Sequence, residues 1–376
     1  MTIYRSFPHA FGEDLPDPAP PPPVHYAEQA LLGGLLLEPH RLHDIPDTQP
    51  AHFGTLTHAA VFDAVSTIPA PTPHQHSEDV AWQTRILDHA RRQARGLTAS
   101  YLHTLIQACP WAKNVAAYAR IVEAGHACRT VRASAQRLAQ TATDSTFPDP
   151  VPAVLAQADT LADLLDELAD RFPRRHTSLP HTPPPVTVAC GDADVALAEE
   201  RLLIATATAH PQEAEDMRWL AARDFTHPFH AGLWQCLNTL IRRGTAIDPV
   251  TLLWEAQEHG LLSTGTDPAD VLRLLTEVAA FPQKWGESIL QRSLLTTAHH
   301  VARRIEAYAD DHATTPPQLI TGSRRALADL TAVRTRWNQA TSPPPTPQPS
   351  PGRAAAPPRA GPPRTKPAPS TPHARH

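Results

Sequence analysis

One pattern of apolar and polar positions occurs twice in the chain and predicts the same buried helix each time. His58-Ala-Ala-Val-Phe-Asp-Ala-Val65 returns 172 residues later as His230-Ala-Gly-Leu-Trp-Gln-Cys-Leu237, and a Phe stands five residues before each His. Small and bulky apolar residues at i, i+3, i+4 and i+7 form one stripe along a helix, which is typical of a helix that faces a core. Two copies in register indicate that one folded unit has been duplicated. The predicted core of the repeat comprises Phe53, His58, Val61, Phe62 and Val65 in the first copy and Phe225, His230, Leu233, Trp234 and Leu237 in the second.

The segments around these helices recur in the same order. An apolar opening helix is predicted at 27–37, and its start is echoed at 198–203, with Ala198-Glu199 set opposite Ala27-Glu28. Gly33-Gly34 lowers helix propensity there, so the pair predicts a close crossing with another helix. No stretch alternates apolar and polar residues over several positions as a strand would. The predicted fold class is therefore all-α, with two homologous helical domains, each a helical bundle with a helical hairpin and a trailing linker helix.

Proline clusters divide the chain, because proline-rich stretches favour extended segments between folded units. The predicted organisation is a flexible leader at 1–24, a first helical domain with its hairpin at 25–141, a linker helix at 142–172, a proline-rich linker at 173–195, a second domain at 196–310, a linker helix at 311–340 and a basic proline-rich tail at 341–376. The tail has 13 prolines in 36 residues and is predicted to be disordered.

Two long amphipathic segments, at about 114–141 and 285–310, are expected to pair with each other inside one chain. Such pairing removes apolar stripes from water at about 25 cal/mol per Å² and predicts a compact monomer. Self-association through the same surfaces is the related expectation. The candidate hairpin interface consists of Tyr118, Ile121, Val122, Leu290 and Leu294.

An acidic helix at 154–172 and a basic helix at 319–337 suggest a second contact between the copies. Attraction between them is one interpretation. The other is that both are solvated faces, since exposed ion pairs contribute about 0–1 kcal/mol each.

Composition and charge narrow the class of protein. The net charge of −5 divides into +5 on residues 341–376 and −10 on the rest, so a phosphate-binding surface is not expected over the body of the protein. Four widely spaced cysteines without a C-x-x-C motif predict buried thiols in a reduced compartment. No run reaches 18 apolar residues, and no basic segment precedes an apolar one at the N-terminus. We therefore expect no membrane contact and a cytoplasmic location.

The order of these motifs resembles the N-terminal domain of the DnaB-type hexameric replicative helicase. That domain opens with A-E-x-x-[LV]-[LI], continues with a Phe and an H-x-x-[IL]-[FW]-x-[AC]-[IVL] helix, and often has D-[PL]-[VI]-T and Y-A-R-I-V further on. The first copy matches at Ala27, Glu28, Leu31, Leu32, Phe53, His58, Val61, Phe62, Ala64, Val65 and Tyr118 to Val122, and the second at Ala198, Glu199, Leu202, Leu203, Phe225, His230, Leu233, Trp234, Cys236, Leu237 and Asp248 to Thr251. The first copy has a Pro/His loop in place of D-P-V-T, and the second has Leu290-Gln-Arg-Ser-Leu294 in place of Y-A-R-I-V.

The helicase motor of that family needs G-x-x-x-x-G-K-[ST], whose backbone cradles the phosphates while the Lys reaches the terminal ones. The three lysines of the chain, Lys113, Lys284 and Lys366, are followed by Asn, Trp and Pro. None of them is a P-loop lysine. The sequence therefore predicts no helicase activity, no catalytic residues and no cofactor.

What the resemblance implies is a non-catalytic DNA-replication accessory or assembly module of the primosome, which binds a replicative helicase, a primase or both by protein–protein contact. An alternative is weak, salt-sensitive nucleic-acid binding through the tail, with candidate contacts Arg353, Arg359, Arg364, Lys366 and Arg375. A third is a His-dependent metal hydrolase that uses His227 and His230, His299-His300 or His40 and His43, although these residues do not converge as an active site requires. His74-Gln-His76 lacks completing ligands and is interpreted as a solvated loop. No metal site is predicted, and His58 and His230 are expected to have a structural hydrogen-bonding role.

Overall fold

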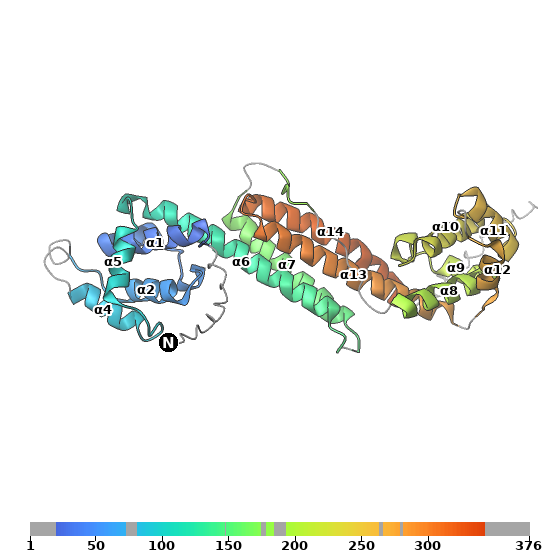
Figure 1. Ribbon diagram of the computed structural model, residues 1–376, viewed down its shortest axis with the longest axis horizontal. Coiled ribbons are helices and arrows are strands. Elements are labelled where there is room, and N and C mark those ends of the chain that lie inside the picture. The colour runs from blue at the N-terminus through green and yellow to red at the C-terminus, as the bar shows by residue number, and fades with distance from the viewer. Residues whose placement is uncertain are drawn as a thin grey trace, which may run out of the picture. The chain divides into compact units, whose positions relative to one another are not determined.

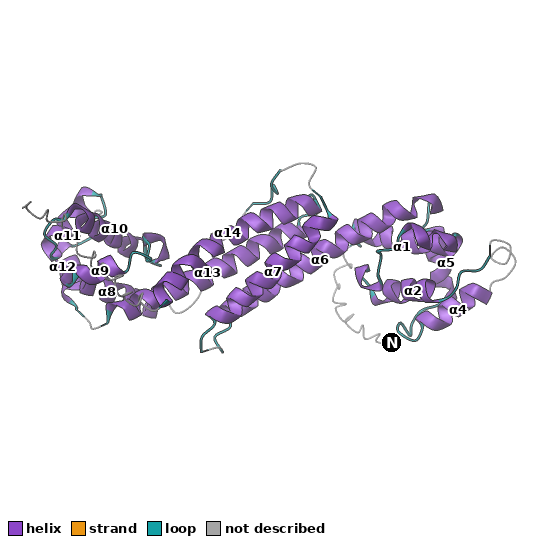
Figure 2. Ribbon diagram, turned by 180° about the vertical axis from the view of Figure 1, so that it is seen from behind, coloured by secondary structure: helices purple, strands orange, loops and turns teal. Residues whose placement is uncertain are grey.

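The structure is a computed structural model that describes residues 20–72, 81–146, 148–173, 178–183, 193–262, 266–278 and 281–342. Its described residues contain helices and no strand, which confirms the all-α prediction (Figures 1 and 2). The described residues up to Ala340 belong to one compact unit. None of the described helices is both long and apolar enough to cross a lipid bilayer.

The first head, residues 20–114, is built from short helices around an apolar centre. Thr55 and Thr98 cap α2 (Leu56–Thr67) and α5 (Ala99–Gln107) by accepting the backbone N–H of His58 and Tyr101, which satisfies donors that the first helical turn leaves free. Phe53 and Phe62 lie with their ring centroids 5.0 Å apart in the core of this head. Its elements are α1 (Pro23–Leu37), η1 (Pro39–Asp44), η2 (Pro50–His52), α2 (Leu56–Thr67), α4 (Ala81–Ala90), α5 (Ala99–Gln107) and η3 (Ala112–Asn114).

The glycine pair of α1 allows the close crossing that the sequence predicts. A Cβ atom on Gly33 would overlap the carbonyl oxygen of Leu105 in α5, and one on Gly34 would lie 2.7 Å from a methyl carbon of Val115. The backbone of α1 therefore lies directly against its neighbours, and a larger residue has no space there.

The second head, residues 193–278, repeats this arrangement. Asp248 caps α11 (Pro249–Glu258) through the amides of Val250 and Thr251. Gly244 ends α10 (Pro228–Arg243) in the left-handed conformation (φ 65°) that glycine adopts without strain. Phe225 and Trp234 occupy the places of Phe53 and Phe62, with ring centroids 5.6 Å apart. The elements are α8 (Ala193–Ala209), α9 (Pro211–Asp216), η4 (Ala222–Asp224), α10 (Pro228–Arg243), α11 (Pro249–Glu258) and α12 (Pro268–Thr276).

Two helical hairpins form a bundle between the copies. The bundle comprises α6 (Val115–Thr143), α7 (Val151–Arg171), α13 (Pro282–Asp310) and α14 (Pro316–Thr341). The helices expected to trail each domain as linkers, within 142–172 and 311–340, are α7 and α14, and they fold back as the second arms of the hairpins. Part of the proline-rich linker also contacts the second hairpin, because Thr182 donates to Asp311 at 2.6 Å.

Candidate protein–protein interface and the buried pairs that support it

A buried Glu–His pair fixes the first head. The Nδ1 atom of His58 lies 2.7 Å from Oε2 of Glu28, and both side chains are almost fully buried. The other oxygen of Glu28 accepts the backbone N–H of Gly54 at 2.8 Å, and Nε2 of His58 lies 2.8 Å from the hydroxyl of Tyr101. Every polar atom of the pair therefore has a partner, as burial of a charge requires. The pair joins α1 to the start of α2 and to α5.

The second head contains the same pair. Nδ1 of His230 lies 2.8 Å from Oε2 of Glu200, and Glu200 also accepts the backbone N–H groups of Thr226 at 2.5 Å and His227 at 3.3 Å. Burial alone would raise the pKa of Glu200, but the hydrogen bonds from His230 and the two amides outweigh it and lower the pKa. The carboxylate form of Glu200 is therefore the stable one in the folded head.

The structure corrects the alignment of the two opening helices by one residue. Glu200, not Glu199, is the counterpart of Glu28, because each of these two residues bonds the His that lies 30 positions further on. Glu199 instead pairs with Arg292 and accepts the hydroxyl of Ser288 at 2.9 Å. The local similarity of A-E to A-E favoured the wrong register, whereas the constant spacing from Glu to His indicates the right one.

His25 joins Glu28 and His58 in a cluster of three residues of metal-ligand type. Its ring centroid lies 4.9 Å from that of His58, and burial together with the neighbouring His58 lowers the pKa of His25. Both oxygens of Glu28 and both nitrogens of His58 already have hydrogen-bond partners, and the second head has the same Glu–His pair. The geometry therefore favours a structural hydrogen-bond network over a metal centre here.

The hairpins contact each other through α6 and α13, the most extensive contact between any two of the described helices. Arg132 pairs with Asp310 at 3.1 Å, and Nδ1 of His299 lies 3.4 Å from the carbonyl oxygen of Ala139. The residue numbers rise along one helix as they fall along the other, so the two helices are antiparallel. A two-fold interface between identical subunits pairs equivalent helices in this way. The structure thus has, inside one chain, the pairing of hairpins that the sequence predicts.

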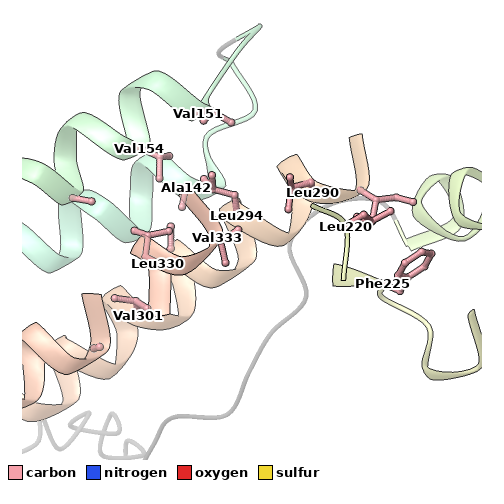
Figure 3. Close-up of a cluster of buried hydrophobic side chains, with 14 of the residues drawn as sticks. Ala142, Val151, Val154, Leu220, Phe225, Leu290, Leu294, Val301, Leu330 and Val333 are labelled. Carbon is pink, nitrogen blue, oxygen red and sulfur yellow. The ribbon is translucent and has the colours of Figure 1, made fainter. Parts of the chain in front are cut away.

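A continuous apolar cluster fills the bundle and extends into the second head (Figure 3). Its bundle part includes Ala142 of α6, Val154 of α7, Leu294 of α13 and Val333 of α14, all buried. Burial of a Val or Leu side chain contributes about 1.5–3 kcal/mol relative to exposure. The hydrophobic effect therefore holds the hairpins together, with polar contacts at the margins.

The five candidate hairpin-interface residues lie in different places. Leu290 and Leu294 belong to the cluster that the bundle shares. Val122 lies in the core of the first head with Tyr118 packed against it, and Ile121 is 47% exposed. The predicted location of these three residues in the hairpin interface is therefore wrong. Val122 and Tyr118 belong to the first head, and Ile121 lies on the surface. The cause is the length of α6, whose N-terminal part packs in the head while its buried residues from Ala127 onward join the bundle.

Ion pairs connect the acidic helix α7 to the basic helix α14. Arg324 pairs with Asp166, and Arg334 lies 2.5 Å from Asp159. All four side chains are more than a third exposed, so each pair contributes about 0–1 kcal/mol. The attraction is present but adds little to the stability of the bundle.

The second head is anchored to the bundle by a buried ionic network. Arg336 of α14 pairs with Asp224 of η4, and Asp224 also accepts the hydroxyl of Ser293 at 2.7 Å and the backbone N–H of Ala221 at 2.8 Å. The Asp224 side chain is fully buried, and that of Arg336 is 13% exposed. Sequence reasoning missed this network because its members come from three separate segments.

The corresponding anchor of the first head contains no carboxylate at this position. His52 stands 172 residues before Asp224, and Arg129 of α6 donates to the His52 carbonyl at 2.7 Å. Burial, His126, Arg171 and Arg129 lower the pKa of His52 to about 4. His52 is therefore neutral at physiological pH, and its protonation would place a charge among cations.

The residues of the other two functional hypotheses do not form a second site in the described part of the chain. His40 and His43 lie in η1, and His299 and His300 in α13, where His299 contacts α6. His227 accepts the backbone N–H of Phe229 at the start of α10. His74, His76 and the predicted tail contacts Arg353, Arg359, Arg364, Lys366 and Arg375 lie outside the described residues.

The two heads define the class of the protein: a duplicated helical domain of replicative-helicase type. Residues 20–124 and 194–283 match the DnaB-like helicase N terminal domain family, so the chain belongs to that family, with one match in each copy. The replicative DNA helicase DnaB of Leifsonia xyli subsp. xyli (strain CTCB07) is 34% identical over 112 residues, which is 30% of this chain and 24% of that helicase. The chain thus matches about a quarter of the length of this curated relative. No solved structure matches the chain.

Proposed function

We propose that this protein is a non-catalytic replication accessory or assembly module that binds a replicative helicase, a primase or both through its helical heads. The observation that carries the proposal is the antiparallel packing of α6 on α13, which joins two family domains in one chain. Such a chain offers a covalently linked pair of domains. The matched segments belong to the N-terminal domain, so helicase catalysis is not indicated by them.

Linkage in one chain favours binding because it removes the cost of assembling the pair from separate subunits. Two domains on one chain have a high effective concentration for each other, and a partner meets an interface that is already formed. The protein would therefore cap, load or sequester a helicase, or hold a primase, without forming its own dimer first.

The surface of the second head offers an apolar contact for such a partner. Val250 and Trp254 lie one turn apart on α11 and are 65% and 60% exposed. Exposed aromatic side chains are frequent energetic centres of protein interfaces. Leu56 of α2, 65% exposed on the first head, provides a matched position for comparison.

The test is a binding assay between the purified full chain and the purified replicative helicase and primase of the same organism. Binding to at least one partner is expected, with a weaker affinity for Val250→Ser/Trp254→Ala than for the control Leu56→Ser. The variant that lacks residues 341–376 separates binding by the heads from binding by the tail. Absence of binding to both partners would overturn the proposal, and ATP hydrolysis by the pure protein would overturn its non-catalytic part.

A further inference from the structure

A cleft in the second head is lined by arginines. It lies between α10 and the segment that runs from α9 to η4, and its volume is about 910 Å³. Its lining contains the charged side chains of Arg218, Arg223, Arg242 and Glu215 and the apolar side chains of Leu220 and Ile241. The cleft therefore combines a net positive charge with an apolar surface.

None of these three arginines has a carboxylate partner among the described residues. Among the residues that the structure describes, none forms an ion pair or hydrogen bond with the guanidinium of Arg218 or Arg223, and both side chains are exposed. Arg242 bonds only uncharged groups of its own helix, the carbonyl of Asn238 and the hydroxyl of Thr239. Arginine matches carboxylates and phosphates with a planar set of donors, so three such groups around one cleft indicate an anionic ligand.

The first head has no such charge at the equivalent positions. With the 172-residue spacing that relates the two Glu–His pairs, Pro46, Ala51 and Ala70 stand in place of the three arginines, and His43 in place of Glu215. The shared fold therefore does not require the arginines, which at these positions belong to the second copy.

The chemistry of the cleft favours carboxylates over a nucleic-acid strand. Single-stranded nucleic acid is bound by stacking of bases on aromatic side chains together with contacts to phosphate. The one aromatic residue that lines the cleft, Trp234, is 1% exposed and its indole N–H donates to the carbonyl of Leu220. An acidic helix face fits the arginines, and its aliphatic neighbours could contact the apolar lining residues.

The chain itself carries an acidic helix face. Asp163, Glu167 and Asp170 of α7 are exposed, and the spacing i, i+4, i+7 places them on one side of the helix. Among the described residues no cation pairs with these three acids, whereas Asp159 and Asp166 are paired with α14. In the described part of the chain, carboxylates without a cationic partner and arginines without a carboxylate partner therefore lie on different surfaces of the same molecule.

We propose that the arginine cleft of the second head, lined by Arg218, Arg223 and Arg242, binds the acidic face of α7 in a second copy of the chain. The two surfaces are different, so the contact is heterologous and leaves one cleft and one acidic face open at the ends of a pair. Further copies then add in the same direction, and the assembly grows with protein concentration. Because exposed charges form the contact, the association weakens as salt is raised.

Sedimentation velocity of the full chain over a range of concentrations, at low and at high salt, tests this proposal. Mass should rise with concentration at low salt and return to that of a monomer at high salt. Arg218→Glu/Arg223→Glu and Asp163→Arg/Glu167→Arg should each weaken association by about tenfold or more, since like charges then face each other. Arg92→Glu/Arg95→Glu, on the surface of the first head, is the matched control and should associate as the wild type does.

Mixing the two reversed variants separates charge complementarity from general effects of charge. The mixture should associate, because the glutamates of one variant face the arginines of the other. A wild type that is monomeric at every salt and concentration overturns the proposal, and so does a mixture that stays monomeric. Binding of a labelled single-stranded oligonucleotide that Arg218→Glu/Arg223→Glu abolishes would also overturn it, because the cleft would then be a phosphate site.

Discussion

Asp224 and Arg336 form the buried ion pair that anchors the second head to the bundle, and its removal is the most informative perturbation of the fold. The Asp224→Ala substitution leaves the Arg336 guanidinium, 13% exposed, without its counter-ion and the Ser293 hydroxyl and Ala221 amide without their acceptor. Loss of one partner of a buried pair costs about 3–5 kcal/mol. We expect the free energy of unfolding of the second head to fall by that amount.

The measurement is urea unfolding followed by tryptophan fluorescence, to which Trp219 beside the network contributes. Asp166→Ala is the matched control, because it also removes an Asp–Arg pair between distant segments. That pair is exposed, so its loss should lower the free energy of unfolding by only about 0–1 kcal/mol. Asp224→Leu/Arg336→Met should recover the part of the loss that comes from the unpaired Arg336, since apolar residues can replace a buried pair, whereas the Ser293 hydroxyl and the Ala221 amide stay without their acceptor. If Asp224→Ala costs no more than Asp166→Ala, the network does not anchor the head.

Three further predictions concern the heads. Gly33→Ala should destabilise the first head by about 3 kcal/mol in urea unfolding because its Cβ overlaps the backbone of α5, whereas Gly96→Ala, with open space around it, should be neutral. The pKa of His52 is lowered to about 4 in the folded protein and lies below its unfolded value, so the free energy of unfolding should fall as the pH drops from about 6.5 toward 4. In unfolding curves recorded over this pH range, His52→Gln should show a smaller fall. Glu200→Ala should lower the free energy of unfolding by about 3 kcal/mol at neutral pH because it leaves His230 and two amides unpaired, and Glu200→Gln should lower it less. Equal stability of Glu200→Ala and wild type would contradict the role of the pair.

The repeat, the all-helical fold and the pairing of the long helices were accessible from the sequence because they depend on local apolar periodicity. The stripe around His58 and that around His230 predict equivalent buried helices, and the structure places both in head cores. The glycine pair of α1 likewise predicts a close crossing that the structure contains.

What the sequence could not specify depends on contacts between distant segments. The alignment of the second opening helix depends on whether Glu199 or Glu200 bonds His230. A local alignment does not distinguish these two adjacent glutamates. Val122 lies on the same amphipathic helix as the bundle residues. Only the tertiary structure shows that the N-terminal part of α6 packs in the first head and the rest packs in the bundle. The arginine cleft was not predicted either, because Arg218 and Arg242 lie in different segments of the chain.

Pairing of α6 with α13 within one chain can be tested by chemical cross-linking. Ala139→Cys and His299→Cys, introduced together into a protein whose native cysteines are replaced by serine, place two thiols at the contact between these helices. Treatment with a short bis-maleimide at high salt should give a cross-linked product that migrates with the mass of one chain on a denaturing gel, whereas either single variant gives none. A product with the mass of two chains, or no product from the double variant, would contradict the account.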